Sequence, residues 1–357
     1  MRRIAILAEG HFDWHTAKTA VGVIRYGQDH VVAVIDSQHS GQDAGDVLHD
    51  PTGPAHGIPV VADVAAALAL QPDTLLIGIA PRGGRLPDEW RPEVLLAIRS
   101  GLGVVSGLHH FLGDDPELAA AARAHGVPIW DVRRPPEATA LRIATFAPRR
   151  AASRVVTFVG SDCNVGKMTA ALEVDREARR RGLSSAFAAT GQTGIMISGR
   201  GIPVDRYICD FEAGGVEALV DEFAAEFDWV FVEGQGSLGH PAYSAVTLGL
   251  LHGSTPDYLL LCHHAGRTHI SGYPDVPIPA LSEVRAMYET AAAWLKPTRT
   301  VGVILNTFGM SEADAHAALR AAEQETRLPV TDPVRFGSGV LVDALLAADR
   351  ERAGGEG

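Results

Sequence analysis

The sequence predicts an α/β protein of two domains, each built on a parallel β-sheet. The chain has 357 residues, a length that usually forms two domains. Short apolar runs alternate with helix-length amphipathic segments along most of the chain, which is the pattern of β-α-β units. Residues 133–153, rich in Arg and Pro, interrupt this alternation. We therefore place the domain boundary near residue 150.

The first domain, residues 1–150, is predicted to be a Rossmann-like parallel sheet. Its apolar runs are nearly continuous, as in strands that are covered on both faces. After the first strand come Glu9, Gly10 and His11, so the Gly-x-Gly-x-x-Gly fingerprint of dinucleotide binding is absent. Asp36 stands where a ribose-binding acid would lie, but the glycines that such a site needs are missing. We therefore do not expect NAD binding. The expected strands are 4–8, 31–35, 75–80, 104–105 and 129–132, and the expected helices are 16–26, 64–70, 92–99 and 117–125.

The second domain, residues 151–357, is predicted to be a P-loop NTPase-like parallel sheet. The helix that begins near Ser311 has a serine at its start and two acids in its first turn, which stabilise a helix N-terminus. The tail 350–357 is expected to fray. The expected strands are 155–159, 185–189, 229–232, 258–262 and 301–305, and the expected helices are 167–181, 216–227, 282–295 and 311–327.

Composition and charge exclude several classes of partner. The net charge is -12, whereas nucleic-acid-binding domains usually carry a basic balance or stripe. No apolar run approaches the roughly 18 residues of a membrane span. The chain has three Cys and no Cys-x-x-Cys pair, which is typical of a reducing compartment. We expect a cytoplasmic protein that acts on a small-molecule substrate and forms a homo-oligomer, with neither nucleic acid nor membrane as a partner.

The strongest chemical signal is a phosphate-binding loop between an apolar strand and a helix. Glycines let such a loop wrap closely around an anion, and the N–H groups of the helix N-terminus add positive potential. Lys167 supplies a compact charge, and it is one of only three Lys in a chain whose other basic residues are Arg and His. The loop consists of Gly160, Ser161, Asp162, Cys163, Asn164, Val165, Gly166, Lys167, Met168 and Thr169.

This loop departs from the standard pattern at the metal-binding position. It has one extra residue between its glycines, as in dethiobiotin synthetase-like P-loop proteins. Met168 occupies the place where a Ser or Thr hydroxyl would hold Mg²⁺, and Thr169 matches the next hydroxyl position. A thioether is a poor ligand for Mg²⁺, which prefers oxygen. Phosphate binding is therefore better supported than Mg²⁺-dependent phosphoryl transfer.

Polar residues at the ends of three further strands are candidates for the same site, because open α/β sheets bind ligands at their carboxyl edge. Glu233 ends an apolar strand, where it would hold a cation or act as a general base, and Gly236 to His240 follow it. Asn306 ends the strand 301–305, where it either forms a turn or, by resemblance to dethiobiotin synthetase-like folds, uses its amide to contact adenine. The strand 258–262 is followed by His263, His264 and Arg267. Either histidine would act as a base, and the arginine would bind a carboxylate.

Two more residues extend the set of candidates. Arg82, in the loop 78–85, would bind an anionic substrate group or only help to turn the chain. Asp210 would approach a cation, so Glu233 and Asp210 are the predicted ligands if the reaction uses Mg²⁺.

The motifs resemble those of a family that joins a Rossmann-like N-terminal domain to a dethiobiotin synthetase-like P-loop domain. Some of its members are described as N-acetyltransferases of D-glutamate catabolism. The matching stretches are spread over nearly the whole chain: Gly-Ile-Ala-Pro-Arg-Gly-Gly (78–84), Ser-Gly-Leu-His-His-Phe-Leu (106–112), the P-loop (160–169), Gly-Gln-Thr-Gly (191–194), Glu-Gly-Gln-Gly-Ser-Leu-Gly-His-Pro (233–241) and Thr-Asp-Pro-Val-Arg-Phe-Gly (331–337).

The resemblance implies N-acetyl transfer from acetyl-CoA to the amine of an acidic amino acid such as D-glutamate. A P-loop can hold the pyrophosphate of acetyl-CoA without Mg²⁺. The base would be Glu233, His240 or His264, backbone N–H groups of residues 236–239 would stabilise the oxyanion, and Arg267 or Arg82 would hold the carboxylates. Two alternatives stay open: an ATP-dependent carboxylate–amine ligase, which needs ATP and a metal, and a non-catalytic nucleotide switch, which we rank last.

Overall fold

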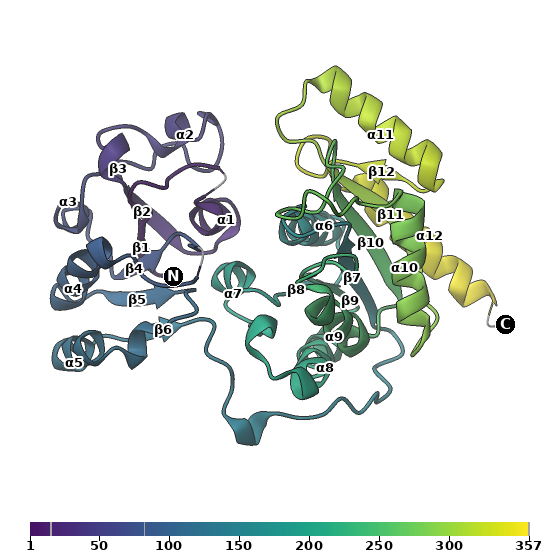
Figure 1. The fold of residues 1–357 in the computed structure, drawn as a ribbon, viewed down its shortest axis with the longest axis horizontal. Coiled ribbons are helices and arrows are strands. Elements are labelled where there is room, and N and C mark those ends of the chain that lie inside the picture. Colours follow the sequence, from purple (N-terminus) through teal and green to yellow (C-terminus); the bar gives the residue numbers. More distant parts are fainter. Residues whose placement is uncertain (15, 82, 356–357) are drawn as a thin grey trace. The chain divides into compact units, whose positions relative to one another are not determined.

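The computed structural model describes residues 1–14, 16–81 and 83–355, and they form two compact units (Figure 1). The first unit contains residues 1–135 and 192–206, and the second contains residues 136–191 together with those from 207 onward. Each unit is built on a parallel six-stranded sheet, so the predicted α/β class with two parallel sheets is confirmed. The units divide earlier than residue 150, and a later segment of the chain returns to the first unit.

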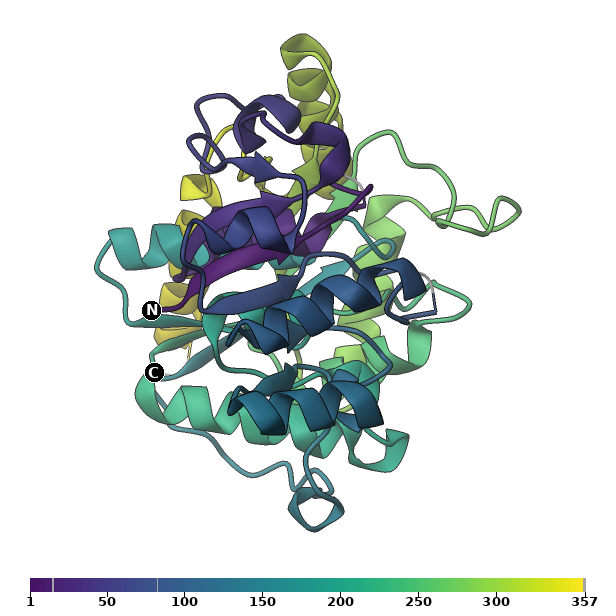
Figure 2. The same ribbon diagram turned by 90° about the vertical axis from the view of Figure 1, so that its left-hand side faces the viewer.

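The first unit has the strand order β3-β2-β1-β4-β5-β6. The order reverses between β1 and β4, and ligands of such sheets bind beyond the carboxyl ends of the strands near this point. Figure 2 shows α4 and α5 next to each other on one face of this sheet. The strands are β1 (Arg3–Leu7), β2 (His30–Ile35), β3 (Val60–Val61), β4 (Thr74–Ile77), β5 (Gly103–Ser106) and β6 (Ile129–Asp131), and the helices are α1 (Lys18–Tyr26), α2 (Ala44–Val47), α3 (Val64–Leu68), α4 (Arg91–Arg99), α5 (Pro116–His125) and α7 (Gln192–Ser198).

The acid at the end of β2 is used by the fold itself. Asp36 is fully buried, its Oδ1 accepts a hydrogen bond from the Gly10 N–H at 3.0 Å, and its Oδ2 lies 2.8 Å from Nδ1 of His39. In a dinucleotide-binding domain an acid at this place binds the ribose. Here its lone pairs are occupied by neighbours in the loops that follow β1 and β2.

Helix α7, which the periodicity did not predict, packs against α1 in the first unit. The Gln192 side-chain amide donates to the Thr19 hydroxyl at 2.8 Å, and the Thr19 and Thr193 hydroxyls lie 3.1 Å apart. A Cβ at Gly107 would stand 1.5 Å from Oε1 of Gln192, so a larger residue there would displace the Gln192 side chain. These contacts explain why residues 192–206 belong to the first unit although the sequence around them belongs to the second.

The second unit has the strand order β12-β11-β10-β7-β9-β8. Its helices α9 and α10 enclose a core with β10 and β11 that includes Leu259, Leu261 and Tyr288. The strands are β7 (Arg154–Gly160), β8 (Ser185–Ala188), β9 (Trp229–Val232), β10 (Tyr258–His264), β11 (Arg299–Asn306) and β12 (Val330–Thr331), and the helices are α6 (Lys167–Arg180), α8 (Cys209–Glu226), α9 (Ser244–Ser254), α10 (Leu281–Ala293), α11 (Glu312–Thr326) and α12 (Gly339–Gly355).

Residues 350–355 differ from the prediction that the tail frays, and residues 356–357 lie outside the described residues. Helix α12 continues to Gly355, because Leu341, Val342 and Leu345 are buried and anchor its first half against the sheet. None of the helices among residues 1–14, 16–81 and 83–355 is long and apolar enough to cross a membrane.

The Arg/Pro-rich segment is held along α8 instead of serving as a free linker (Figure 1). The backbone N–H groups of Thr145 and Phe146 donate to the Glu217 carboxylate at 2.8 and 2.5 Å. Arg149 pairs with Asp221 at 2.8 Å. These contacts place residues 136–150 in the second unit, which is why the unit boundary lies before them.

Glu212, on the first turns of α8, is a buried acid whose Oε1 has no hydrogen-bond partner in the described part of the chain. It packs against α9 at Gly249, where a Cβ would stand 2.5 Å from that oxygen. Burial raises the pKa of Glu212 from 4.5 to about 7. Between pH 4.5 and about pH 7, Glu212 is therefore mostly protonated in the folded state and mostly ionised in the unfolded state.

We predict that Glu212→Gln makes the free energy of unfolding less dependent on pH. Because the folded pKa is raised, wild-type stability should fall as the pH rises from about 4.5 to about 7 and then level off. The amide carries no charge, so the variant should be more stable than wild type by about 2 kcal/mol at pH 8 and have no advantage at pH 4.5. Urea unfolding at both pH values measures this, and an equal pH dependence in the two proteins would contradict it.

Candidate active site

The predicted P-loop joins β7 to α6 at the carboxyl edge of the second sheet. Asn164 and Gly166 adopt left-handed backbone conformations, with φ of 54° and 98°. A Cβ at Gly160 would stand 2.9 Å from the Val165 side chain and 3.1 Å from Nζ of Lys167, so the turn is too tight for a larger residue. Helix α6 starts directly after this turn, and the N–H groups of its first residues have no helical acceptor. The local structure is therefore that of an anion-binding loop.

Lys167 spans the loop from the first turn of α6. Only 6% of the residue is exposed, and Nζ donates to the backbone carbonyl of Asp162 at 2.9 Å. Burial lowers the pKa of Lys167, while electrostatic attraction to Cys262, Cys163, Asp162 and Glu233 opposes this shift. If a bound phosphate replaced the Asp162 carbonyl as the acceptor, the Lys167 ammonium would form a stronger, charge-assisted hydrogen bond.

Asp162 fixes the middle of the loop. It is fully buried, and its Oδ2 accepts hydrogen bonds from Nη1 of Arg267 and from the Ser271 N–H, both at 2.8 Å. The same Arg267 nitrogen donates to the carbonyl of Cys163 at 2.8 Å. Arg267 thus braces the P-loop, and its predicted role as a substrate ligand stays a prediction that this geometry does not favour.

His240, on the loop after β9, is oriented toward Asp162. Its Nδ1 accepts the Ala242 N–H at 3.1 Å, so the proton of the neutral ring is on Nε2. Nε2 lies 3.9 Å from Oδ1 of Asp162, and the ring packs on Tyr243 and Tyr273 with centroids 4.4 and 5.3 Å away. Nδ1 is therefore engaged by the backbone, Nε2 makes no hydrogen bond to Asp162 at this distance, and the role of His240 as a base stays a prediction.

Three of these side chains lie close enough to one another to hold a metal ion. Among the described residues, Asp162, Cys163 and His240 form such a group, with their ligand atoms within 4.8 Å of one another. Arg267 already pairs with the Asp162 carboxylate, and burial together with Asp162 raises the pKa of the Cys163 thiol. Both effects disfavour a cation, because metal ligands must be deprotonated and their charge uncompensated.

Glu233 and Asp210, the predicted Mg²⁺ ligands, do not belong to that group. Glu233 is buried at the end of β9, whereas Asp210 is exposed on the first turn of α8. Mg²⁺ binding by this pair stays a prediction.

The Glu233 carboxylate holds the loop that leads from β8 into α7. Its Oε2 accepts the N–H groups of Thr190 and Gly191 at 2.9 and 3.0 Å. A Cβ at Gly191 would stand 2.6 Å from Nε2 of Gln235 and 3.3 Å from Oε1 of Glu233, so the Gln235 side chain also packs against this loop. At Gly234 a Cβ would meet Cδ of Lys167 at 2.9 Å. Gly234 therefore lies against the P-loop lysine, and the Glu233 carboxylate is near enough to oppose the lowering of the Lys167 pKa. The role of Glu233 as a base or a cation ligand remains a prediction.

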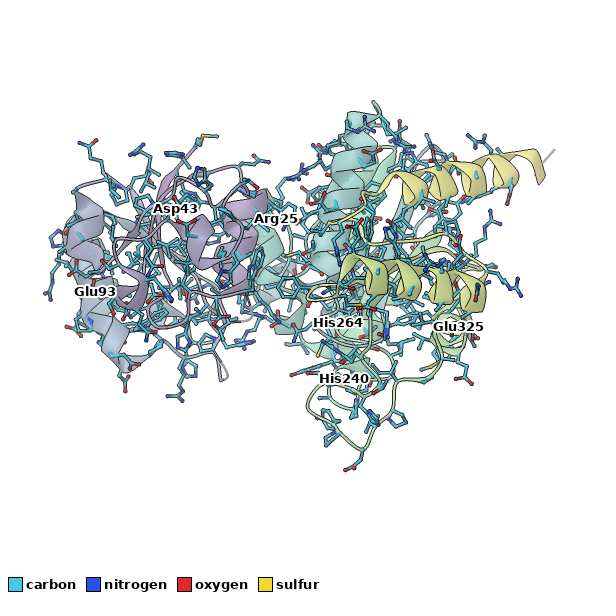
Figure 3. All side chains as sticks on the ribbon, turned by 90° about the horizontal axis from the view of Figure 1, so that it is seen from above. Arg25, Asp43, Glu93, His240, His264 and Glu325 are labelled. Carbon is cyan, nitrogen blue, oxygen red and sulfur yellow. The ribbon has the colours of Figure 1, made fainter. Side chains whose placement is uncertain are left out.

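His264 and Asn306 are neighbours at the ends of β10 and β11, where they pair in register. Nδ1 of His264 lies 3.0 Å from the Ala265 carbonyl oxygen. The Asn306 amide nitrogen lies 3.8 Å from the position that a Cβ on Gly166 would take, so Asn306 stands next to the P-loop. Figure 3 labels His240 and His264 in this unit. Arg82 lies outside the described residues.

Two contacts that no motif indicated connect the P-loop with its neighbours. The Ser161 hydroxyl lies 2.7 Å from Nδ1 of His263, whose pKa falls to about 4 through burial and the nearby His264 and Arg267. The buried Tyr288 hydroxyl donates to the Gly160 carbonyl at 2.7 Å and accepts the Leu238 N–H at 3.1 Å. The Leu238 N–H is thus engaged, and oxyanion stabilisation by the other N–H groups of residues 236–239 stays a prediction.

Comparison with protein families identifies the two units. The model described as "Domain of unknown function (DUF1611_N) Rossmann-like domain" matches residues 37–135. The model described as "Domain of unknown function (DUF1611_C) P-loop domain" matches residues 142–342. The chain belongs to the DUF1611 family. A crystal structure of a DUF1611 family protein from Anabaena variabilis has a TM-score of 0.90 and 40% identity, and the match covers 97% of this chain and 100% of that one.

Two curated relatives share most of the length of this DUF1611 protein. A protein of Tritonibacter scottomollicae is 41% identical over 336 residues, which are 94% of this chain and 96% of that protein. A protein of a Pseudoalteromonas species is 36% identical over 285 residues, 80% of this chain and 83% of its own. Both relatives are named D-glutamate N-acetyltransferase. The predicted family resemblance and the prediction of an N-acetyltransferase-like enzyme are confirmed.

Proposed function

We propose that this DUF1611 protein transfers the acetyl group of acetyl-CoA to the amine of an acidic amino acid, D-glutamate in the first instance. The observation that carries the proposal is the match to two relatives named D-glutamate N-acetyltransferase over 94% and 80% of this chain. The P-loop supports the choice of donor, because acetyl-CoA contains a pyrophosphate that such a loop can bind.

Binding of the donor would use the P-loop and its rim. Lys167 and the N–H groups at the start of α6 would hold the pyrophosphate, while Asn306, beside Gly166, would contact the adenine. Met168 is the second residue of α6 and offers no oxygen to a metal. Arg267 already neutralises Asp162. The positive charge needed for the pyrophosphate would thus come from the chain itself.

The reaction forms a C–N bond and breaks a C–S bond. The neutral amine attacks the thioester carbonyl, the nitrogen gives up a proton to a base, and the CoA thiolate leaves and takes a proton. Glu233 is our proposed base, because it acts electrostatically on Lys167 at the carboxyl edge of the sheet and Nδ1 of His240 already accepts the Ala242 N–H. A positioned base of this kind contributes roughly 100- to 10,000-fold to the rate.

The proposal is tested by mixing the purified protein with D-glutamate and either acetyl-CoA or ATP with acetate. Mass spectrometry and a thiol assay should detect N-acetyl-D-glutamate and free CoA in equal amounts with acetyl-CoA alone. Product that forms only with ATP, together with ADP or AMP, would replace this proposal by the ATP-dependent ligase. L-Glutamate and D-glutamine serve as controls for the stereochemistry and the charge of the acceptor.

A further inference from the structure

The loop that follows β12, residues 332–337, is tied to the end of β11 by a buried acid. Oδ2 of Asp332 accepts the backbone N–H and the hydroxyl of Thr307 at 2.9 and 2.6 Å. Oδ1 accepts the N–H groups of Val334 and Arg335 at 3.0 and 3.3 Å. Thr307 directly follows Asn306, the residue proposed to contact the adenine. The loop therefore lies at the carboxyl edge of the second sheet, where such sheets bind ligands, and the proposed function gives it no role.

Arg335 carries an exposed guanidinium group on this loop. Its Nη1 donates to the carbonyl and the hydroxyl of Thr307, both at 3.3 Å, and to the Met310 carbonyl at 3.1 Å. The group also lies over the Phe336 ring at 5.4 Å. All of these partners are neutral, and among residues 1–14, 16–81 and 83–355 no acid forms an ion pair with Arg335. Nη1 is thus fixed by the protein, while Nε and Nη2 donate to no described residue.

The surroundings of this cation are apolar and open to solvent. Val334 and Phe336 flank it in sequence, and both are exposed, as is Phe308 on the loop after β11. The Phe336 ring stacks on His316 of α11 with the centroids 4.5 Å apart. Exposed rings beside a cation suit a nucleotide, because a base packs on apolar surface while the cation pairs with a phosphate.

The place of Arg335 relative to the P-loop follows from contacts within the second unit. The Asn306 amide nitrogen lies 3.8 Å from the position of a Cβ on Gly166, and Arg335 contacts the next residue, Thr307. Coenzyme A carries a phosphate on the 3′-oxygen of its ribose, which ATP and ADP lack. With the pyrophosphate in the P-loop and the adenine at Asn306, the ribose lies between them, and its 3′-phosphate comes close to the residues that Arg335 contacts.

We propose that Arg335 binds the 3′-phosphate of coenzyme A, an inference that rests on the proposed function. Nε and Nη2 form one edge of the guanidinium and offer two parallel N–H groups to phosphate oxygens. The phosphate stays partly hydrated at this exposed place, so a single cation is enough to hold it. The Asp332 carboxylate is buried under four hydrogen bonds, and the charge that this loop turns to solvent is the positive one of Arg335.

The test measures the affinity for CoA and for 3′-dephospho-CoA by calorimetry without an acceptor. Wild type should bind CoA about 5- to 30-fold more tightly, the effect of one charge-assisted pair at a surface. Arg335→Gln should lower the affinity for CoA by the same factor and leave that for 3′-dephospho-CoA within about twofold of wild type, so that the preference disappears. Arg335→Lys should keep part of the preference, because it retains the charge without the planar fork.

The matched control is Arg350→Gln, which removes another exposed arginine of the second unit, near the far end of α12. This variant should keep the full preference for CoA. In the acetyl-transfer assay the KM for acetyl-CoA should rise in Arg335→Gln, while the KM for acetyl-3′-dephospho-CoA stays unchanged.

Three results would overturn the proposal. They are equal binding of CoA and 3′-dephospho-CoA by wild type, an equal loss of both ligands in Arg335→Gln, and loss of the preference in Arg350→Gln. The second result would show that Arg335 only holds the turn after β11 in shape. Failure of the proposed function is distinct, because wild type would then bind CoA with the preference set by Arg335 and transfer no acetyl group to D-glutamate. Binding of ATP without any binding of CoA would overturn both.

Discussion

Replacement of Lys167 by alanine should lower the rate of acetyl transfer by about 100- to 1,000-fold, the usual effect of removing one preorganised charge from a catalytic site. The ammonium spans the P-loop to the Asp162 carbonyl and is nearly fully buried, so no neighbouring side chain can replace it. Steady-state kinetics with varied acetyl-CoA should show the loss mainly in kcat/KM, because the charge holds the pyrophosphate.

The variant Lys167→Arg keeps a positive charge at this position but changes the size and shape of the group that carries it. A guanidinium is broader than the ammonium and does not fit beside Gly160, where the lysine Nζ is already 3.1 Å from the position of a Cβ. We expect this variant to be nearly as impaired as alanine. Lys18→Ala, which removes an exposed lysine of α1, is the control and should retain wild-type activity. A folded Lys167→Ala enzyme with normal turnover would show that the loop is only a turn.

Glu233→Gln should lower kcat by about 100-fold or more and leave the affinity for acetyl-CoA nearly unchanged. The amide keeps the shape of the side chain, and its oxygen can still accept the N–H groups of Thr190 and Gly191. What disappears is the negative charge and the capacity to take a proton from the amine. Rapid-quench kinetics at saturating acetyl-CoA measure the chemical step directly.

The control for this variant is Glu226→Gln, which changes an exposed acid in the last turn of α8. It should leave both kcat and the donor affinity at the wild-type level. If Glu233→Gln instead loses acetyl-CoA binding and each bound complex reacts at the normal rate, Glu233 is a binding residue and another group is the base. If Glu233 is the base, a higher pH should raise the rate of Glu233→Gln, because the amine of the acceptor then loses its proton to solvent. If Glu233 only binds the donor, a higher pH should leave the rate of the variant unchanged.

The features that could be predicted from the sequence are those with a local signal, either a motif with fixed spacing or a run of apolar residues. The P-loop was predicted residue by residue, because a tight turn before a helix needs glycine at Gly166 and because Lys167 follows at a fixed spacing. The parallel sheets were predicted because strands covered on both faces are nearly continuous apolar runs. The expected strand 229–232 agrees with β9 at both ends.

The remaining features depend on contacts between distant residues that no local pattern encodes. Helix α7 belongs to the first unit because Gln192 hydrogen bonds with Thr19. Tyr288, in the middle of α10, shows no motif, yet its hydroxyl connects Gly160 with Leu238. The pairing of the Arg267 guanidinium with the buried Asp162 carboxylate was likewise not indicated by any motif. Such pairings arise from tertiary packing, which composition and spacing do not describe.

We propose that the P-loop of this DUF1611 protein holds the pyrophosphate of acetyl-CoA with protein groups alone, since Met168 stands where a hydroxyl would bind Mg²⁺. The most direct measurement is the initial rate of N-acetyl-D-glutamate formation from acetyl-CoA, first with excess EDTA and then with added Mg²⁺. We predict equal rates within about twofold and no dependence on ATP. A strict requirement for Mg²⁺ and ATP, with ADP or AMP released in step with product, would contradict the claim.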